Sequence, residues 1–319
     1  MPNLEEVNNF IQFELTPAQE DLEKKRIRMF KGKSKSLLLS IFTGIFIAVI
    51  FSFILTPFGG FIVGSLVPFF LYKYLLKRKI KSFHKLFQEQ IYRKLIAYIL
   101  PEFVYQTESS GLKNHYLESG LYSLESTKSK KYYEGDLASG TFDGCSVEFS
   151  EFIASVKIRV ISSDINGPKS TTSILPVFNG LFFTASLQKS YQGKTYILPG
   201  NEDKDEGALD EHLLNSIGTL EYPCEAGSPD FQKMFQVFSS NHEEANSILT
   251  PTLQNLLMDY RQKHPPLRIS ILGSRLYIAL FSERFIKKMD LTFSSGTDNL
   301  PDNLAEEILF SLDVLKEVN

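Results

Sequence analysis

Residues 36–72 read SLLLSIFTGIFIAVIFSFILTPFGGFIVGSLVPFFLY, and none of these 37 residues carries a charge. A helix rises about 1.5 Å per residue, so about 20 residues cross a hydrocarbon core of about 30 Å. One straight helix of this length is therefore too long for a single span. A proline and two glycines at 57–60 favour a turn near the middle. The pattern predicts a transmembrane helical hairpin at residues 36–76, with spans at about 37–56 and 58–76.

Basic residues cluster on both sides of this stretch. Residues 1–85 hold 13 Lys and Arg against 6 Asp and Glu, and all 13 basic residues lie at 24–35 or 73–85. Basic residues that flank a span stay on the cytoplasmic side, and two spans place both clusters on one side. The sequence therefore predicts an integral membrane protein with both termini in the cytoplasm. A cleaved signal peptide does not fit, because the apolar stretch is too long and begins too late.

The rest of the chain is acidic. Residues 86–319 hold 21 basic and 31 acidic residues, although the whole chain has a net charge of only -3. This excess of negative charge repels phosphate, so we expect no nucleic-acid partner. Lysines and two tyrosines do mix at 128–133, but we interpret that segment as a solvated loop.

Small residues recur every four positions in both spans, which lets helix backbones approach closely in lipid. Either the two spans pack against each other through them, or the hairpin also self-associates. No Asp, Glu, Lys, Arg or His lies between residues 36 and 72, so ion conduction is not expected. The small residues that could serve either contact are Ser40, Gly44, Ala48, Gly60 and Gly64.

Helices are expected on both sides of the hairpin. In segment 1–35, Thr16 and Pro17 predict a helix start, because threonine caps helices and proline suits the first helical position. In segment 77–101, apolar residues recur at spacings of three and four and predict one helix that ends at Pro101. That apolar face consists of Ile80, His84 (or Phe83), Phe87, Ile91, Leu95 and Tyr98.

Residues 102–319 are expected to form one cytoplasmic domain of the α+β class, with a mainly antiparallel sheet flanked by helices. Asp143-Gly144 and Gly273-Ser274 predict hairpin turns between alternating strands. Asn179-Gly180 interrupts an apolar run and indicates either a tight turn or a bulge. Late in the domain, helices are expected from Ser240 (with Glu243 completing a capping box), from Thr250-Pro251 and from Pro301.

Four segments resemble an uncharacterised bacterial family of two-span membrane proteins with a cytoplasmic domain of unknown function. With the hairpin, they cover roughly residues 30–285. The resemblance implies a domain tethered to the bacterial cytoplasmic membrane and supplies no activity, cofactor or catalytic residue. The segments are FSEFIASVKI (149–158), VFNGLFFTASLQKSYQGKTYILPG (177–200), FQVFSSNHEEANSILTPTLQNLL (235–257) and ISILGSRLYIAL (269–280).

No motif assigns chemistry to the domain. The spacings typical of zinc sites, phosphate-binding loops and serine hydrolases do not occur. We therefore assign no catalytic residue, no cofactor and no metal ligand. His212 beside Asp210 and Glu211 is interpreted as part of a solvated acidic loop, and Cys145 as a buried structural thiol. The five histidines, His84, His115, His212, His242 and His264, lie far apart in the sequence.

Two functions follow as hypotheses. The first is a membrane-anchored interaction module that is not an enzyme: it binds the bilayer through residues 36–76, and its domain scaffolds or regulates an unidentified protein partner. The alternative is a hydrolase at the membrane surface whose active site assembles from distant residues. A deep pocket that converges on Cys145, His212, His242 or the acidic cluster at 201–212 would favour the hydrolase.

Overall fold

The computed structural model describes all residues except 55–56, 108–110, 123–129, 165–166, 201–222 and 283–299. It describes only the backbone of residues 30–36, 51–54, 57–68, 158–164, 167–169, 175 and 300. The chain divides into two compact units. Unit 1 comprises Met1–Ile99 and Ile286–Asp302, and unit 2 comprises Leu100–Phe285 and Asn303–Asn319.

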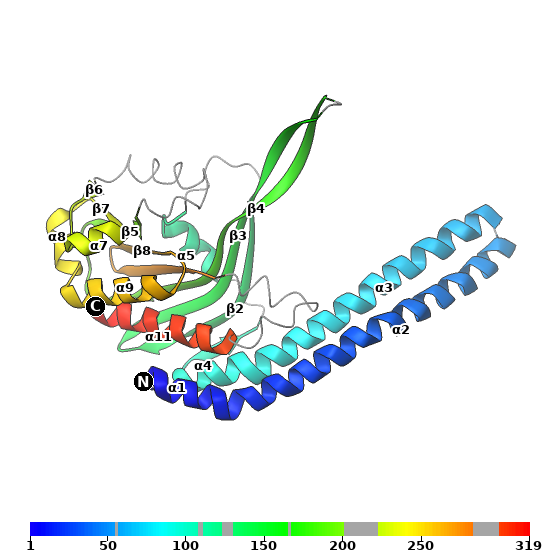
Figure 1. The fold of residues 1–319 in the computed structure, drawn as a ribbon, viewed down its shortest axis with the longest axis horizontal. Coiled ribbons are helices and arrows are strands. Elements are labelled where there is room, and N and C mark those ends of the chain that lie inside the picture. Colours follow the sequence, from blue (N-terminus) through cyan, green and yellow to red (C-terminus); the bar gives the residue numbers. More distant parts are fainter. Residues whose placement is uncertain (55–56, 108–110, 123–129, 165–166, 201–222, 283–299) are drawn as a thin grey trace. The chain divides into compact units, whose positions relative to one another are not determined.

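Unit 1 is built from two long helical stretches that run side by side (Figure 1). The first stretch ends at Ile54 and the second begins at Pro57, so Pro57 and the glycines at 59 and 60 belong to the start of the second stretch. The first stretch consists of α1 (Leu4–Phe10), η1 (Ile11–Leu15) and α2 (Thr16–Ile54), and the second of α3 (Pro57–Phe87), η2 (Gln88–Tyr92) and α4 (Arg93–Ile99).

The helix start predicted at Thr16 is wrong. The chain is already helical from Leu4, where Asn3 and Glu6 form a capping box at the N-terminus of α1. Pro17 lacks an N–H group and would disrupt a regular helix interior. The π-helical turn η1 lies just before it, and there the Thr16 hydroxyl donates to the Ile11 carbonyl at 3.1 Å. The helix therefore passes through the predicted start without ending.

The helix predicted within residues 77–101 is present and continues directly from α3 to Ile99. Phe83, Phe87, Ile91 and Leu95 are buried, as the apolar spacing predicted. Tyr98 is instead 37% exposed, although its ring stacks on Phe10 with the ring centroids 4.1 Å apart. This contact joins the ends of the two helical stretches within unit 1.

Unit 2 is organised around one nine-stranded sheet in the order β1-β2-β3-β4-β9-β8-β5-β7-β6. Every pairing among the described strands is antiparallel, so the predicted α+β class with an antiparallel sheet is confirmed. The strands are β1 (Val104–Gln106), β2 (Lys130–Phe142), β3 (Cys145–Asp164), β4 (Gly167–Ser186), β5 (Lys194–Pro199), β6 (Pro223–Cys224), β7 (Phe235–Ser239), β8 (Leu267–Leu272) and β9 (Arg275–Phe281).

Both predicted hairpin turns are confirmed. Asp143 and Gly144 have φ angles of 49° and 76° and connect Phe142 to its partner Cys145, which is the backbone that a two-residue turn requires. Gly273 has a φ of 62° in the turn between β8 and β9. The segment interpreted as a loop at 128–133 is different, because its described part, from Lys130, belongs to β2.

Asn179-Gly180 does not form a turn, because β4 passes straight through it. The irregularity lies two residues earlier, where Ala154 pairs with Phe178 but Ser155 pairs with Pro176. Glycine is needed at 180 for a different reason: a Cβ atom there would lie 1.9 Å from the Leu280 carbonyl oxygen. Gly180 therefore marks the place where the backbones of β4 and β9 approach each other closely.

β3 and β4 extend beyond the other strands as a two-stranded ribbon (Figure 1). β2 begins opposite Val156 and β9 ends opposite Gly180, while β3 and β4 continue pairing as far as Asp164 and Gly167. The ribbon is thus the continuation of the two longest strands, each of 20 residues.

Both faces of the sheet are covered. On one face, α5 packs its buried Leu112 and Tyr116 into a cluster with Phe152, Phe178 and Phe182. The alternate residues of the central strands, including Phe183 and Ile278, are buried on the opposite face. The helices of unit 2 are α5 (Leu112–Glu118), α7 (Pro229–Met234), α8 (His242–Ile248), α9 (Pro251–Lys263) and α11 (Leu300–Val318, which begins in unit 1).

Candidate functional site

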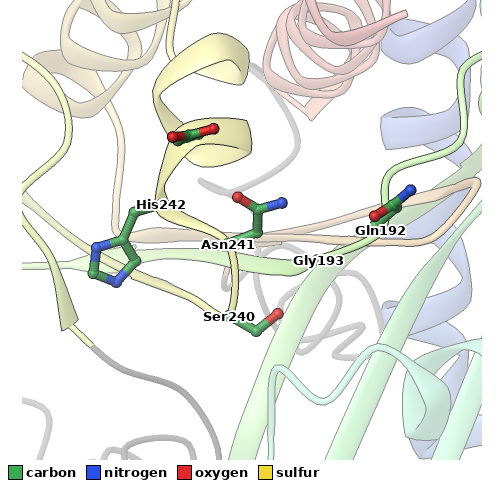
Figure 2. A pocket seen from close by; sticks show the side chains of 6 residues that line it. Gln192, Gly193, Ser240, Asn241 and His242 are labelled. Carbon is green, nitrogen blue, oxygen red and sulfur yellow. The ribbon is translucent and has the colours of Figure 1, made fainter.

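A shallow polar hollow lies where the segment before β5 meets the start of α8 (Figure 2). Antiparallel pairing of β5 with β7, for example Thr195 with Ser239, brings these two parts of the chain together. The hollow has a volume of about 460 Å³ and is lined by Gln192, Gly193, Ser240, Asn241, His242 and Glu243.

The backbone donors beside the hollow are bound by Glu244. The Gln192 N–H donates to its Oε1 at 2.9 Å, and the Gly193 N–H donates to its Oε2 at 2.6 Å. A side chain at position 193 would lie 2.8 Å from the Asn241 Cβ, so this close approach requires glycine. Two N–H groups that could hold an anionic ligand are therefore already bound to a carboxylate of the chain itself.

The capping box predicted for Ser240 and Glu243 is wrong. Asn241 caps α8, since its Oδ1 accepts from the Glu244 N–H at 3.2 Å. The Ser240 hydroxyl instead accepts from the Lys194 N–H at 2.9 Å. These polar groups hold β5, β7 and α8 together. The exposed side chains of His242 and Glu243 remain to form hydrogen bonds with a polar molecule in the hollow.

The two cysteines are free and buried, as expected for structural thiols. Burial raises the pKa of the Cys145 thiol, Asp143 adds to this rise, and the Gln188 backbone opposes it. Burial also raises the pKa of the Cys224 thiol. Both groups are therefore held as thiols, whereas a nucleophile must become a thiolate.

The described histidines lie in separate environments. His242 borders the hollow, whereas the His115 Nδ1 lies 3.2 Å from the Glu118 carboxylate. The His264 Nε2 lies 3.2 Å from the Glu306 carboxylate, and its ring stacks on Tyr260. His212 and its acidic neighbours lie outside the described residues. Within the described part of the chain, no group of three or more His, Cys, Asp or Glu is placed to hold a metal ion.

A second candidate site is the outer surface of α2 in unit 1. Phe42 and Phe46 are 68% and 67% exposed, whereas Ser40 is only 1% exposed and Gly44 is buried. Because α2 packs along α3, the small residues take the helix-to-helix contact and the large apolar residues point outward. We define the α2 apolar surface as the exposed residues Leu37, Leu38, Leu39, Ile41, Phe42, Ile45, Phe46, Val49 and Ile50.

Over the residues that the structure describes, no helix has both the length and the apolar character needed to span a membrane.

Residues 176–319 match the family model described as "Protein of unknown function (DUF3137)". The match begins within β4 and covers most of the strands and helices of unit 2 that follow. It agrees with the resemblance to an uncharacterised family over the last three of the four segments, does not extend to the hairpin or support a membrane character, and provides no activity. Neither the comparison with curated proteins nor the comparison with solved structures finds a match.

Only some of the residues that shape the hollow could be predicted from the sequence. His242 was singled out and borders the hollow, whereas Cys145 does not line it. Glu244 was missed, since its partners at 192 and 193 lie about fifty positions away and no spacing pattern joins them. The described residues therefore give no support to the hydrolase hypothesis based on Cys145.

Proposed function

We propose that this protein is an interaction module of the bacterial cytoplasmic membrane. In this proposal residues 36–76 form a transmembrane hairpin, and both termini lie in the cytoplasm. Residues 102–319 scaffold or regulate a protein partner at the membrane surface. Tethering raises the local concentration of such a domain around a membrane partner without any added contact.

The α2 apolar surface is the observation that carries this proposal. In a water-soluble helix pair, large apolar residues face the partner helix and polar residues face outward. Unit 1 shows the reverse arrangement, with Ser40 and Gly44 inside and Phe42 and Phe46 outside. Small residues between helices and large apolar residues outside are typical of helices in lipid. An exposed apolar surface of this kind needs a cover of lipid or protein.

Charge supports the orientation. No charged residue occurs from Ser36 to Tyr72, while basic clusters lie at 24–35 and 73–85. This support comes from the sequence, because the side chains at 51–68 are outside those described. The clusters favour a hairpin whose two ends both return to the cytoplasm.

The acidic domain fits a protein partner better than nucleic acid or a bare anionic lipid surface. Residues 86–319 hold ten more acidic than basic residues. Such an excess of negative charge repels the closely spaced phosphates of nucleic acid and of an anionic lipid surface. The raised pKa values of Cys145 and Cys224 also make nucleophilic catalysis by these thiols unfavourable. Binding is therefore the function that we favour for this domain.

Membrane extraction tests the anchor. The full chain is expected to remain in the membrane pellet after alkaline carbonate washing, and Phe42→Lys combined with Phe46→Lys is expected to release a large fraction. Phe13→Lys is the control, because Phe13 is 72% exposed but lies outside the uncharged stretch. Complete release of the wild-type chain would rule out the anchor.

Topology and partner binding need separate measurements. A phosphatase reporter that folds only outside the cytoplasm, fused after Asn319, is expected to be inactive, and activity would overturn the orientation. In-cell cross-linking followed by capture from solubilised membranes is expected to recover a reproducible partner. Consistent recovery of the chain alone, with no cross-linked protein or second copy, would contradict the interaction module.

A further inference from the structure

Three tyrosines gather where α5 covers the sheet. The Tyr116 ring stacks on Phe152 and on Tyr122, with centroid distances of 4.6 and 5.7 Å. The Tyr132 ring, from the start of β2, meets Tyr116 edge-on at 6.1 Å. We define Tyr116, Tyr122 and Tyr132 as the tyrosine cluster. It belongs entirely to unit 2 and is independent of the hairpin.

Two hydroxyl groups of this cluster are buried without a hydrogen bond. Tyr116 is fully buried, and neither its Oη nor that of Tyr132 has a partner among the described residues. The surrounding polar groups are satisfied: the Ser119 hydroxyl donates to the Tyr116 carbonyl, and the Ser270 hydroxyl donates to the Ser119 carbonyl, both at 2.7 Å. Buried polar groups nearly always have a partner, and these two phenols lack one among the described residues.

Two cations flank the tyrosine cluster. The guanidinium of the buried Arg268 lies 4.6 Å from the Tyr122 ring centroid and donates to the Leu121 carbonyl at 3.3 Å. The Lys113 ammonium lies 5.2 Å from the Tyr132 ring centroid. The nearby Glu134 carboxylate accepts from the Leu112 N–H at 3.2 Å. The cluster is therefore rich in hydrogen-bond donors and positive charge.

The phenol of Tyr116 is also held in its protonated form. Burial raises its pKa well above the usual range, and Tyr122 and Tyr132 raise it further, although Arg268 acts in the opposite direction. The hydroxyl consequently remains a donor at neutral pH. Tyr122 and Tyr132 are only partly buried and pack against the core cluster that contains Tyr116.

We propose that the tyrosine cluster binds a small oxyanion, either a carboxylate or a phosphate group. The hydroxyls of Tyr116 and Tyr132 donate to its oxygens, and the positive charges of Arg268 and Lys113 balance its charge. Phenol and guanidinium donors match the acceptor oxygens of either group. This site lies apart from the polar hollow and does not depend on the membrane anchor.

Thermal unfolding of the full chain in detergent, followed by circular dichroism, tests this proposal. Sodium phosphate and sodium acetate are titrated at constant ionic strength against sodium chloride. A ligand that binds only the folded state stabilises it by RT ln(1 + [L]/Kd), so the unfolding temperature keeps rising with the logarithm of the ligand concentration above Kd. We expect this logarithmic rise with phosphate or acetate, and the more effective anion identifies the group bound.

Phenylalanine variants separate binding from a general salt effect. Tyr116→Phe and Tyr132→Phe each remove one hydroxyl and are expected to weaken the apparent affinity about tenfold, since a hydrogen bond to a charged group contributes that much. Tyr133→Phe is the matched control, because Tyr133 is 50% exposed on the other face of β2, and it should respond like the wild type.

Two results would overturn the proposal. One is an equal response to each anion in the wild type and all three variants, which indicates salt alone. The other is no response of the wild type to either anion, which indicates buried hydroxyls without a ligand. If Tyr116→Phe does not fold, Tyr132→Phe decides the matter, because Tyr132 is only partly buried.

Discussion

Glu244 joins two parts of unit 2 through a single carboxylate. Its two oxygens accept from the N–H groups of Gln192 and Gly193 at 2.9 and 2.6 Å. Glu244→Gln removes the charge and one acceptor oxygen, so one N–H group loses its partner. We expect the free energy of unfolding to fall by about 1–3 kcal/mol, measured by denaturant unfolding.

The neighbouring glutamate provides the control for this residue-scale prediction. Glu243 is exposed on the same helical turn, and Glu243→Gln is expected to change stability by about 0.5 kcal/mol or less. Equal effects of the two substitutions would show that the contacts of Glu244 do not contribute. Glu244 bonds to the segment before β5, so the difference in stability between the two variants measures the contribution of its contacts.

At the scale of an element, α9 depends on its N-terminal cap. The Thr250 Oγ1 accepts from the Leu253 N–H at 3.1 Å, which satisfies one of the free donors at the helix start. The same hydroxyl donates to the Glu317 carboxylate of α11 at 3.4 Å. We expect Thr250→Ala to lower the free energy of unfolding by about 1 kcal/mol.

Thr252, two positions further along α9, serves as the matched control. It is exposed within the first helical turn, so Thr252→Ala removes the same atoms without removing a cap. Its effect should be neutral or slightly stabilising, because alanine has the higher helix propensity. A loss of stability as large as that of Thr250→Ala would attribute the effect to threonine itself instead of the cap.

At the scale of the whole molecule, buried tyrosines should make the protein sensitive to alkali. Burial is the largest cause that raises the pKa of Tyr116, Tyr132, Tyr191 and Tyr277. The folded state therefore keeps these protons to higher pH than the unfolded chain does. At pH values below the ordinary tyrosine pKa of about 10, both states keep these protons and stability does not depend on them. As the pH rises above that value, the unfolded chain loses its protons first and the free energy of unfolding decreases.

Unfolding midpoints measured across alkaline pH, together with tyrosinate absorbance, check this expectation. Tyr116→Phe should make the decrease shallower, whereas Tyr133→Phe, at an exposed position, should not. Cys145 and Cys224 act in the same direction, because burial raises their pKa values too, and all variants retain both thiols. If Tyr116→Phe leaves the decrease of the unfolding midpoint with pH unchanged, the result would be inconsistent with a raised pKa for Tyr116.

Local signals predicted the parts of this fold whose cause is local. Asp143-Gly144 and Gly273-Ser274 form the expected turns, since positive φ angles need residues of this kind. Thr250 caps α9 as expected. Where a residue has two possible partners, local signals failed: Thr16 lies inside a helix, and Ser240 bonds to β5 instead of capping α8.

Interactions between distant residues were beyond prediction. Gly180 was singled out, yet its reason is the Leu280 carbonyl one hundred positions away. Glu244 and the tyrosine cluster carried no spacing signal at all. In each case the contact is made across the sheet or between a strand and a helix, and a single sequence contains no record of those pairings.

By itself, the sequence determined the uncharged stretch at 36–72, the basic residues around it and the α+β class, because charge and hydrophobic period are properties of neighbouring residues. Only the tertiary structure decided which groups are buried without a partner and which are already bonded. It showed that the N–H groups of Gln192 and Gly193 are taken by Glu244, whereas the Tyr116 and Tyr132 hydroxyls have no bond in the described part. The reason is that hydrogen-bond satisfaction depends on the order of strands, which brings together residues that are remote in the chain.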